Sequence, residues 1–427
     1  MNTENRPLNL FESILYQLDR SSPFNILISV HFDGCIELSS IKEALTYVKK
    51  SHFYLNYHIE ESVDPRFVYT EKPIRVMSYS GLSSFERKEL LHREVNSSSI
   101  HEDYPLAKAI VIQDDKNTEF ILKISHIISD GISAYGLVKE LFENMSVLAN
   151  SRQPIPYPIE DIQPYPSLFP EWKKQKVDNV EHHYPMQPAP EVPMNKRSTH
   201  IIEEDIDPVV SQKIFSFCQQ NGFSVNSFLM SCLIKAMANK LQTSQQTHPI
   251  TLKTSSGLDL RKYYATNLSS YNLACWAGFG YLFYDLGTEI KYDIDIKDLA
   301  ALYDAELKDS LSNNIPFFHL NALSQLYRNK SDRELSSLTS SKLPYVLLTN
   351  IGKLDLPQTD ALNISIKRVG FITPMHRNWL NNLGFGLCAS TTKGSLHLNF
   401  CYMSPAWQES NAQEFTKSIL HFLQHIT

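Results

Sequence analysis

The chain has 427 residues, more than one typical hydrophobic core organises, so its length indicates two domains. Its 42% hydrophobic and 20% charged residues are ordinary for a globular protein, and a net charge of −6 argues against a nucleic-acid-binding surface. No apolar run approaches the roughly 18–20 residues that span a bilayer, and residues 1–7 lack a signal-peptide pattern, so we expect a cytoplasmic protein without a transmembrane segment.

The first part of the chain alternates short apolar runs with helical patterns. Ser39 and Ser40 are expected to cap one helix, and a capping box from Ser83 to Glu86 predicts another. A hairpin is expected at residues 108–113 and 119–125, followed by a helix from Gly131 to about residue 150. The remaining strands of this part are expected at residues 24–32, 53–59, 66–70 and 74–79.

A proline-rich stretch separates the two parts. Residues 154–193 hold ten of the chain's 22 prolines, which excludes helix and central strand and predicts an extended crossover that proteases cut first. We interpret His182 and His183 within it as solvated. The predicted domains are therefore residues 1–153 and 197–427, joined by a linker at 154–196.

The second part again mixes strands and helices. Asp207 and Pro208 predict a helix start, and Gly222 a helix end. Further helices are expected at residues 225–241, 296–311 and 407–426. Strands are expected at residues 199–206, 250–254, 276–286, 345–348, 364–372, 384–390 and 395–402.

The stretch from Ser125 to Gly131 lies where the strand 119–125 ends and a helix begins. A neutral imidazole at His126 can act as a general base there, with the positive end of the helix close by for developing negative charge. Asp130 can cap the helix, and Gly131 tolerates unusual backbone angles and lets a ligand come close. The same residues also fit a purely structural strand end and helix cap.

The pattern His126-x-x-x-Asp130-Gly131 resembles the core of the HHxxxDG motif of the chloramphenicol acetyltransferase-like superfamily. That group includes BAHD plant acyltransferases, condensation domains of peptide synthetases, fungal alcohol acetyltransferases and polyketide-associated acyltransferases. Ser125 replaces the first motif histidine, whereas the second, which carries the chemistry in the family, is present as His126. The resemblance implies an α/β fold of two similar sandwich domains, each a mixed sheet flanked by helices, with a tunnel between them.

Two stretches of the second part resemble further motifs of this superfamily. In residues 257–261, the resemblance implies that Arg261 pairs with Asp130 and joins the two halves. In residues 349–352, it implies that Thr349 can hydrogen-bond the oxyanion, while Asn350 shapes the turn or contacts substrate. A polar turn with only local hydrogen bonds fits residues 349–352 equally well. The plant signature Asp-Phe-Gly-Trp-Gly is absent, and we assign no role to residues 382–386.

The cysteines and histidines show no pattern of a metal site. None of the six cysteines stands in a Cys-x-x-Cys pair, and most have apolar neighbours, which indicates reduced, packed thiols and argues against disulfides or zinc. The resemblance implies no metal and no permanently bound cofactor. It implies acyl-CoA, or an acyl-phosphopantetheine carrier, as a substrate.

The sequence thus predicts an acyltransferase in which His126 deprotonates an alcohol or amine that attacks a thioester, without a covalent acyl-enzyme. One alternative is a condensation-type enzyme of natural-product or lipid biosynthesis that uses an acyl carrier protein in trans. Another is a non-catalytic family member, which the replacement at Ser125 would fit. We expect free acyl-CoA as donor, since no carrier motif occurs in the sequence and the net charge of −6 offers no broad basic face to an acidic carrier. The basic clusters at residues 173–176 and 328–330 could meet coenzyme A phosphates or a carrier surface.

Overall fold

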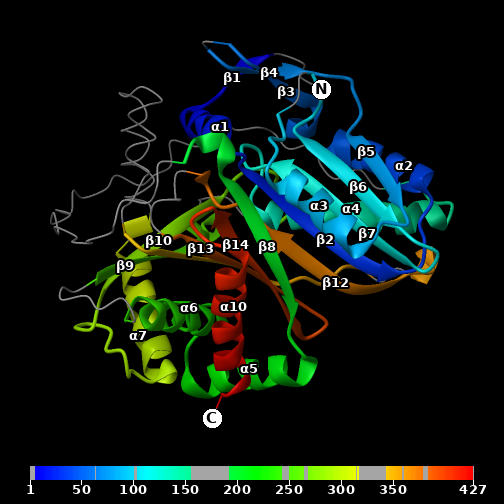
Figure 1. The fold of residues 1–427 in the computed structure, drawn as a ribbon. Coiled ribbons are helices and arrows are strands. Elements are labelled where there is room, and N and C mark those ends of the chain that lie inside the picture. The colour runs from blue at the N-terminus through cyan, green and yellow to red at the C-terminus, as the bar shows by residue number, and fades with distance from the viewer. Residues whose placement is uncertain are drawn as a thin grey trace.

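The computed structural model (Figure 1) describes residues 5–62, 64–100, 103–154, 192–242, 250–263, 268–313, 315–316, 343–357, 360–377 and 383–426. Most of the expected linker, including His182 and His183, lies outside these ranges. The basic clusters at residues 173–176 and 328–330 lie outside them as well. These features therefore stay sequence predictions.

A five-stranded mixed sheet forms the centre of the N-terminal half. Its strand order is β12-β2-β7-β6-β5, with β5 parallel to β6 and the other neighbours antiparallel. The antiparallel pairing of β6 and β7 confirms the expected hairpin. The strands are β2 (Asn25–Asp33), β5 (Arg75–Ser80), β6 (Ala107–Gln113), β7 (Asn117–Ser125) and β12 (Ser365–Ile372).

Within the described residues, four helices and a small sheet complete this half. Helix α4 packs on α2 and on β2, and His52 at the end of α2 contacts Glu140 of α4 at 2.6 Å. The helices are α1 (Leu10–Ser21), α2 (Leu38–Ser51), α3 (Ser84–Val95) and α4 (Gly131–Ala149). The short elements are β1 (Arg6–Pro7), η1 (Phe53–Asn56), β3 (Tyr57–Glu60) and β4 (Arg66–Tyr69), and their sheet has the order β1-β4-β3.

A six-stranded mixed sheet forms the C-terminal half, in the order β10-β9-β11-β13-β14-β8. Its strands are β8 (Ser198–Asp205), β9 (Ile250–Asp259), β10 (Ala277–Leu286), β11 (Tyr345–Lys353), β13 (Phe385–Thr392) and β14 (Ser395–Ser404). In the described ranges, the helices of this half are α5 (Pro208–Asn221), α6 (Val225–Gln242), α7 (Ile296–Ser312) and α10 (Glu409–Gln424), with short turns η2 (Met194–Lys196), η3 (Arg261–Tyr263) and η4 (Asp360–Leu362). Figure 1 shows α5, α6, α7 and α10 together below this sheet.

The two faces of the six-stranded sheet belong to different cores. On β11, Val346 and Leu348 pack with the helices of the C-terminal half, whereas Tyr345 and Leu347 pack with residues of the N-terminal half. Side chains alternate between the faces of a strand. Thr349 therefore lies on the face that the N-terminal half covers.

Strand β12 also joins the two halves, because it belongs to the later part of the chain but pairs within the N-terminal sheet. It pairs with β2, with Phe371 opposite Ile28. Figure 1 shows this strand, in orange, alongside the blue β2. Val369 and Phe371 are buried in the N-terminal core. A strand from within residues 197–427 thus completes the N-terminal sheet, while the domain boundaries themselves stay a prediction.

The expected α/β fold with two mixed sheets flanked by helices is confirmed, but some local predictions are wrong. Helix α2 begins at Leu38 with Glu37 at its N-cap position, and no side chain caps it, so Ser39 and Ser40 are helical residues rather than caps. Residues 53–56 form a 3-10 turn rather than the start of a strand. The capping box at Ser83 and the αL conformation of Gly222 after α5 are as expected.

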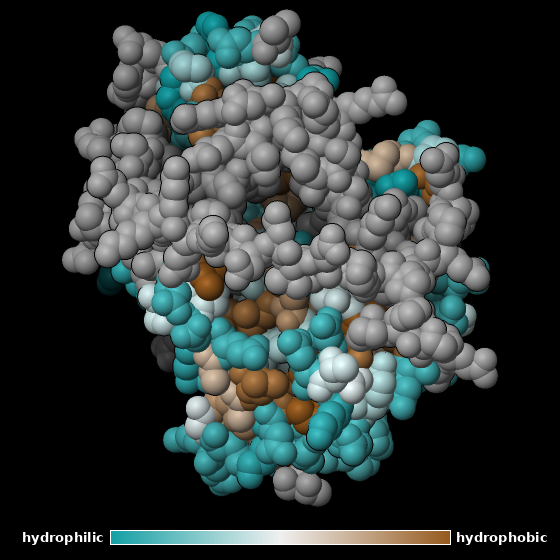
Figure 2. All heavy atoms as spheres, turned by 90° about the vertical axis from the view of Figure 1, so that its left-hand side faces the viewer, coloured by the Kyte–Doolittle hydropathy of each residue, from teal (hydrophilic) through white to brown (hydrophobic). Residues whose placement is uncertain are grey.

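The six cysteines carry free thiols, as expected, and only Cys35 among them is exposed. None of the helices in the described ranges combines the length and apolar character that a membrane crossing requires. The left-hand side of Figure 1, where β9 and β10 lie, faces the viewer in Figure 2. The described part of that face shows hydrophobic residues interleaved with hydrophilic ones (Figure 2).

Candidate functional site

His126 lies in the turn that connects β7 to α4. Its backbone N–H donates to the carbonyl of Phe24 at 2.9 Å, and its ring stacks on the Phe24 ring with 4.4 Å between centroids and 10° between planes. The residue is half-buried, in contrast to its neighbours Ser125 and Ile127, which are buried. The backbone bond and the stacked ring thus fix the imidazole while part of it stays accessible.

The surroundings of His126 favour its neutral form. Burial lowers the pKa of the imidazole from the usual 6.5, while the charge of Asp130 and the carbonyls of His126 and Ser129 act in the opposite direction. Nδ1 is buried and makes no well-formed hydrogen bond with the described residues. Nε2 is therefore the nitrogen left to meet a substrate, and it can accept a proton when the ring is neutral.

Asp130 anchors the start of α4. Its Oδ1 accepts from the backbone N–H of Ser133 at 2.8 Å and from the Ser133 hydroxyl at 2.9 Å, which completes a capping box. Its Oδ2 accepts from the backbone N–H of Trp276 at 2.8 Å. The carboxylate is thus fully engaged and acts as a structural anchor rather than as an acid or base.

The predicted ion pair between Asp130 and Arg261 is confirmed. Arg261 Nη2 lies 2.9 Å from Asp130 Oδ1, and the two side chains are only 6% and 3% exposed. Arg261 Nη1 also donates to Asp259 at 2.9 Å. Burial opposes the charge of Arg261, but the two carboxylates outweigh it and raise the pKa of the guanidinium. The pair ties the His126 turn to the end of β9.

Gly131 is required by packing rather than by its backbone angles, which corrects the expectation from the sequence. It is absent from the residues with positive φ. A Cβ at this position would lie 2.8 Å from a methyl carbon of Ile351 and 3.0 Å from the ring of Phe371. Both contacts come from the late strands β11 and β12, so the first turn of α4 fits closely against them.

Thr349 and Asn350 point in different directions from β11. A Cβ at Gly257 would lie 3.2 Å from the hydroxyl oxygen of Thr349, so this hydroxyl lies over β9 on the face toward the N-terminal half. Thr349 is two residues, about 7 Å along the strand, from Ile351 and hence from the contact with Gly131. Asn350 Oδ1 accepts from the N–H of Gly352 at 3.0 Å, a local hydrogen bond within the turn.

Ser125, in place of the first motif histidine, is fully buried at the end of β7. Its hydroxyl accepts from the N–H of Ile127 at 3.3 Å, and its own N–H donates to the carbonyl of Leu106. Its contacts are those of a residue that shapes the turn.

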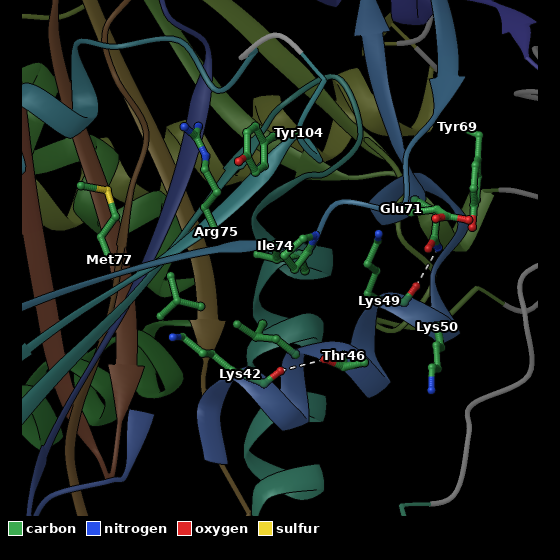
Figure 3. Close-up of a pocket in the computed structure, with 14 residues that line it drawn as sticks. Lys42, Thr46, Lys49, Lys50, Tyr69, Glu71, Ile74, Arg75, Met77 and Tyr104 are labelled. Carbon is green, nitrogen blue, oxygen red and sulfur yellow. Dashed lines mark hydrogen bonds between the residues drawn. The ribbon is translucent and has the colours of Figure 1, made fainter. Parts of the chain in front are cut away.

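A separate pocket of about 900 Å³ lies between α2 and β5 (Figure 3). Lys42, Lys49, Lys50 and Arg75 line it, but Lys49 already donates to the carbonyls of Thr70 and Lys72. Its lining includes neither His126 nor any other predicted site residue. Among the residues that the structure describes, no group of three histidine, cysteine or acidic side chains is placed to hold a metal ion.

The sequence did not predict two contacts of the site, the Phe24 ring on His126 and the Trp276 N–H on Asp130. Both join residues far apart in the chain, and neither residue type marks such a role in advance. Lys253, on the same sheet face as Thr349, was also not singled out. A lysine in a strand is usually solvent-exposed, and only the folded structure places it between tyrosines.

Similarity to known proteins is limited in sequence. No family model matches. Over 161 residues, 35% of this chain, it is 27% identical to a linear gramicidin synthase subunit of Brevibacillus parabrevis, and it spans only about 3% of that protein's length.

Solved structures match nearly the whole chain. Polyketide synthase associated protein 5 from Mycobacterium tuberculosis has a TM-score of 0.69 at 15% identity, covering 98% of this chain and 96% of that one. TRI3 trichothecene 15-O-acetyltransferase from Fusarium sporotrichioides has a TM-score of 0.69 at 12% identity, covering 98% of this chain and 94% of that one. The epimerization domain from the third module of tyrocidine synthetase B has a TM-score of 0.66 at 12% identity, covering 99% of this chain and 95% of that one. These matches confirm the expected fold, and their names differ enough that fold alone does not choose a reaction.

Proposed function

We propose that this protein is an acyltransferase that moves an acyl group from a thioester donor to an alcohol or amine, with His126 as general base. The observation that carries the proposal is the construction of the His126 turn. The imidazole is half-buried and fixed by the Phe24 ring, its pKa is lowered by burial, and the turn is anchored through the Asp130–Arg261 pair. A merely structural histidine has no need of an accessible ring at a turn held so firmly.

In the proposed reaction, Nε2 of His126 takes the proton of the acceptor hydroxyl or amine as its oxygen or nitrogen attacks the thioester carbonyl. The negative charge that develops on the carbonyl oxygen meets the N–H groups at the start of α4 and the hydroxyl of Thr349. The tetrahedral intermediate then expels the thiolate. His126 returns its proton to the sulfur, so the base is restored and no acyl-enzyme forms.

A second candidate is a condensation-type enzyme whose donor is carried by an acyl carrier protein. It is favoured by the sequence match to a gramicidin synthase subunit and by the fold matches to condensation domains. Both candidates use the same residues in the same roles and differ in what carries the thioester. The expectation of free acyl-CoA therefore stays a proposal, and the Ser125 contacts give no separate support to a non-catalytic role.

The proposal is tested with the purified full chain and a panel of acyl-CoA donors, each mixed with alcohols and amines, by following thiol release with a colour reagent. We expect release that depends on the acceptor and forms an ester or amide detected by mass spectrometry. Release only from an acylated carrier protein would assign the second candidate. Failure with both donor types across the panel would contradict acyl transfer.

A further inference from the structure

Lys253 occupies an unusual place on β9. Its neighbour Leu252 is fully buried in the core under the helices, so Lys253 points to the other face of the sheet, toward the N-terminal half. There its ammonium lies 4.4 Å from the centre of the Tyr281 ring on β10 and 5.5 Å from that of Tyr345 on β11. The two neighbouring strands thus place aromatic rings on both sides of this cation.

No carboxylate in the described part of the chain balances this charge. Lys253 forms no ion pair there, and burial alone lowers its pKa to about 8. The two tyrosines supply no negative charge, since burial raises the pKa of Tyr281 to about 12 and also raises that of Tyr345. Their ring faces attract a cation but compensate only part of its lost hydration. At pH 7 the ammonium form still predominates, so the sheet holds a half-buried positive charge without a counter-ion among the described residues.

Two other lysines, half-buried Lys235 and buried Lys49, are satisfied differently. The ammonium of Lys235 donates to the carbonyls of Tyr292 and Ile294, each at 2.7 Å. The ammonium of Lys49 likewise donates to two carbonyls. These hydrogen bonds account for Lys235 and Lys49 as structural residues. No comparable hydrogen bond to the described residues accounts for Lys253.

Lys253 is aligned with the candidate site. Lys253, Ser255 and Gly257 share one face of β9, and Gly257 lies beside the hydroxyl of Thr349. Four residues of strand separate Lys253 from Gly257, which is about 13 Å. At the edge of the sheet, Phe283 of β10 pairs directly with Lys253 and is 39% exposed, so the surface is close on that side. Lys253 thus stands between the surface and the proposed point of acyl transfer.

We propose that Lys253, between Tyr281 and Tyr345, binds the phosphate of a phosphopantetheine thioester whose reactive end reaches Thr349 and His126. This inference rests on the proposed function, because it names the anionic group of that reaction's donor. Phosphopantetheine carries a phosphate at one end and a thiol at the other, separated by an uncharged arm. The cation selects donors that carry this phosphate, whether it belongs to coenzyme A or to a carrier protein.

The test compares two donors that differ in a single phosphate, acyl-4′-phosphopantetheine and acyl-pantetheine with the same acyl group. Wild type is expected to prefer the phosphorylated donor by roughly 10- to 100-fold in kcat/KM, the usual range for a hydrogen-bonded charge. Lys253→Gln should abolish this preference through KM, leaving kcat and the use of acyl-pantetheine nearly unchanged. Lys253→Arg should retain much of it, and the control Lys235→Gln should keep it fully.

Two results would overturn the phosphate assignment. One is a wild type without preference between the two donors, and the other is a Lys253→Gln variant that loses activity equally with both. Should Lys253→Gln fail to fold, Lys253→Met takes its place, and the wild-type preference decides the matter alone. Running acyl-CoA and an acylated carrier protein in parallel then identifies the source of the phosphate.

Failure of the inference and failure of the proposed function are distinguishable. If no thioester is turned over at all, the proposed function fails, and calorimetric titration with 4′-phosphopantetheine and pantetheine still tests Lys253. Tighter binding of the phosphorylated compound to wild type, lost in Lys253→Gln, supports the phosphate site independently of turnover. Equal binding of both compounds contradicts it.

Discussion

The ionisation of His126 sets the pH at which the site can work. A general base must be neutral, and burial lowers the pKa of this imidazole from 6.5. The imidazole is therefore half protonated at a pH below 6.5, whereas a histidine in water is half protonated at about pH 6.5. We predict that kcat/KM is constant through pH 7 and falls on an acid limb below pH 6.5. A limb centred above pH 6.5 in a pH-rate profile would contradict this environment for the base.

Sequence reasoning at the residue scale worked where a motif fixed the partners. His126, Asp130 and Arg261 were predicted, and the ion pair is present, because the motif specifies both the residues and their order. For Gly131, the sequence predicted the glycine's importance but attributed it to backbone angles. The side chains of Ile351 and Phe371, which leave no room for a Cβ there, lie more than 200 positions away in the sequence. Lys253 could not be predicted, since its unusual surroundings become visible only when β10 and β11 flank it.

At the scale of elements, one buried ion pair couples the start of α4 to the end of β9. We predict that Asp130→Ala and Arg261→Ala each lower the free energy of unfolding by about 3–5 kcal/mol, because each leaves a buried partner charge uncompensated. The double variant should be less destabilised than the sum of the two, as measured by denaturant unfolding.

The control for this cycle is Asp259→Ala. Asp259 contacts the same guanidinium at 2.9 Å, but its side chain is 41% exposed. Its loss should cost no more than about 1 kcal/mol, as for other exposed pairs. Strictly additive effects of Asp130→Ala and Arg261→Ala would show that the two residues do not interact in solution.

Helices and hairpins with local signals were predictable, whereas elements that depend on distant partners were not. Local signals, each confined to a few neighbouring residues, specify the capping box at Ser83, the Asp207–Pro208 start of α5 and the turn between β6 and β7. The pairing of β12 with β2 joins residues from opposite ends of the chain, and no local pattern indicates it. Helix α1 was missed although Asn9 and Glu12 form a capping box, a signal that the sequence did contain.

At the scale of the molecule, the two halves depend on each other. Besides β12, Arg87 of α3 binds Glu119 of β7 at 2.5 Å and Glu203 of β8 at 2.6 Å, so one guanidinium bridges both sheets. The candidate site lies along the same junction, with His126 on one half and Thr349 on the other. The reaction that we propose therefore requires both halves in contact.

This dependence predicts that residues 1–153 do not fold alone. Without β12, strand β2 would be left as an edge, and the core that buries Val369 and Phe371 would be open. We expect the isolated fragment to show no cooperative thermal transition, and co-expression with residues 197–427 to restore one. A cooperative transition of residues 1–153 by themselves would contradict the structural role assigned to β12.

The central claim is that His126 is the base for acyl transfer, and one comparison tests it most directly. His58 is a matched control, since it is also half-buried, its pKa is also lowered by burial and its Nδ1 is also buried without a hydrogen bond to the described residues, but it lies on β3 outside the motif. With the donor and acceptor identified by the thiol-release panel, His126→Ala should fold normally by circular dichroism and lose about 10²–10⁴-fold in kcat. His58→Ala should retain turnover close to wild type. Wild-type turnover in folded His126→Ala, or an equal loss in both variants, would contradict the account.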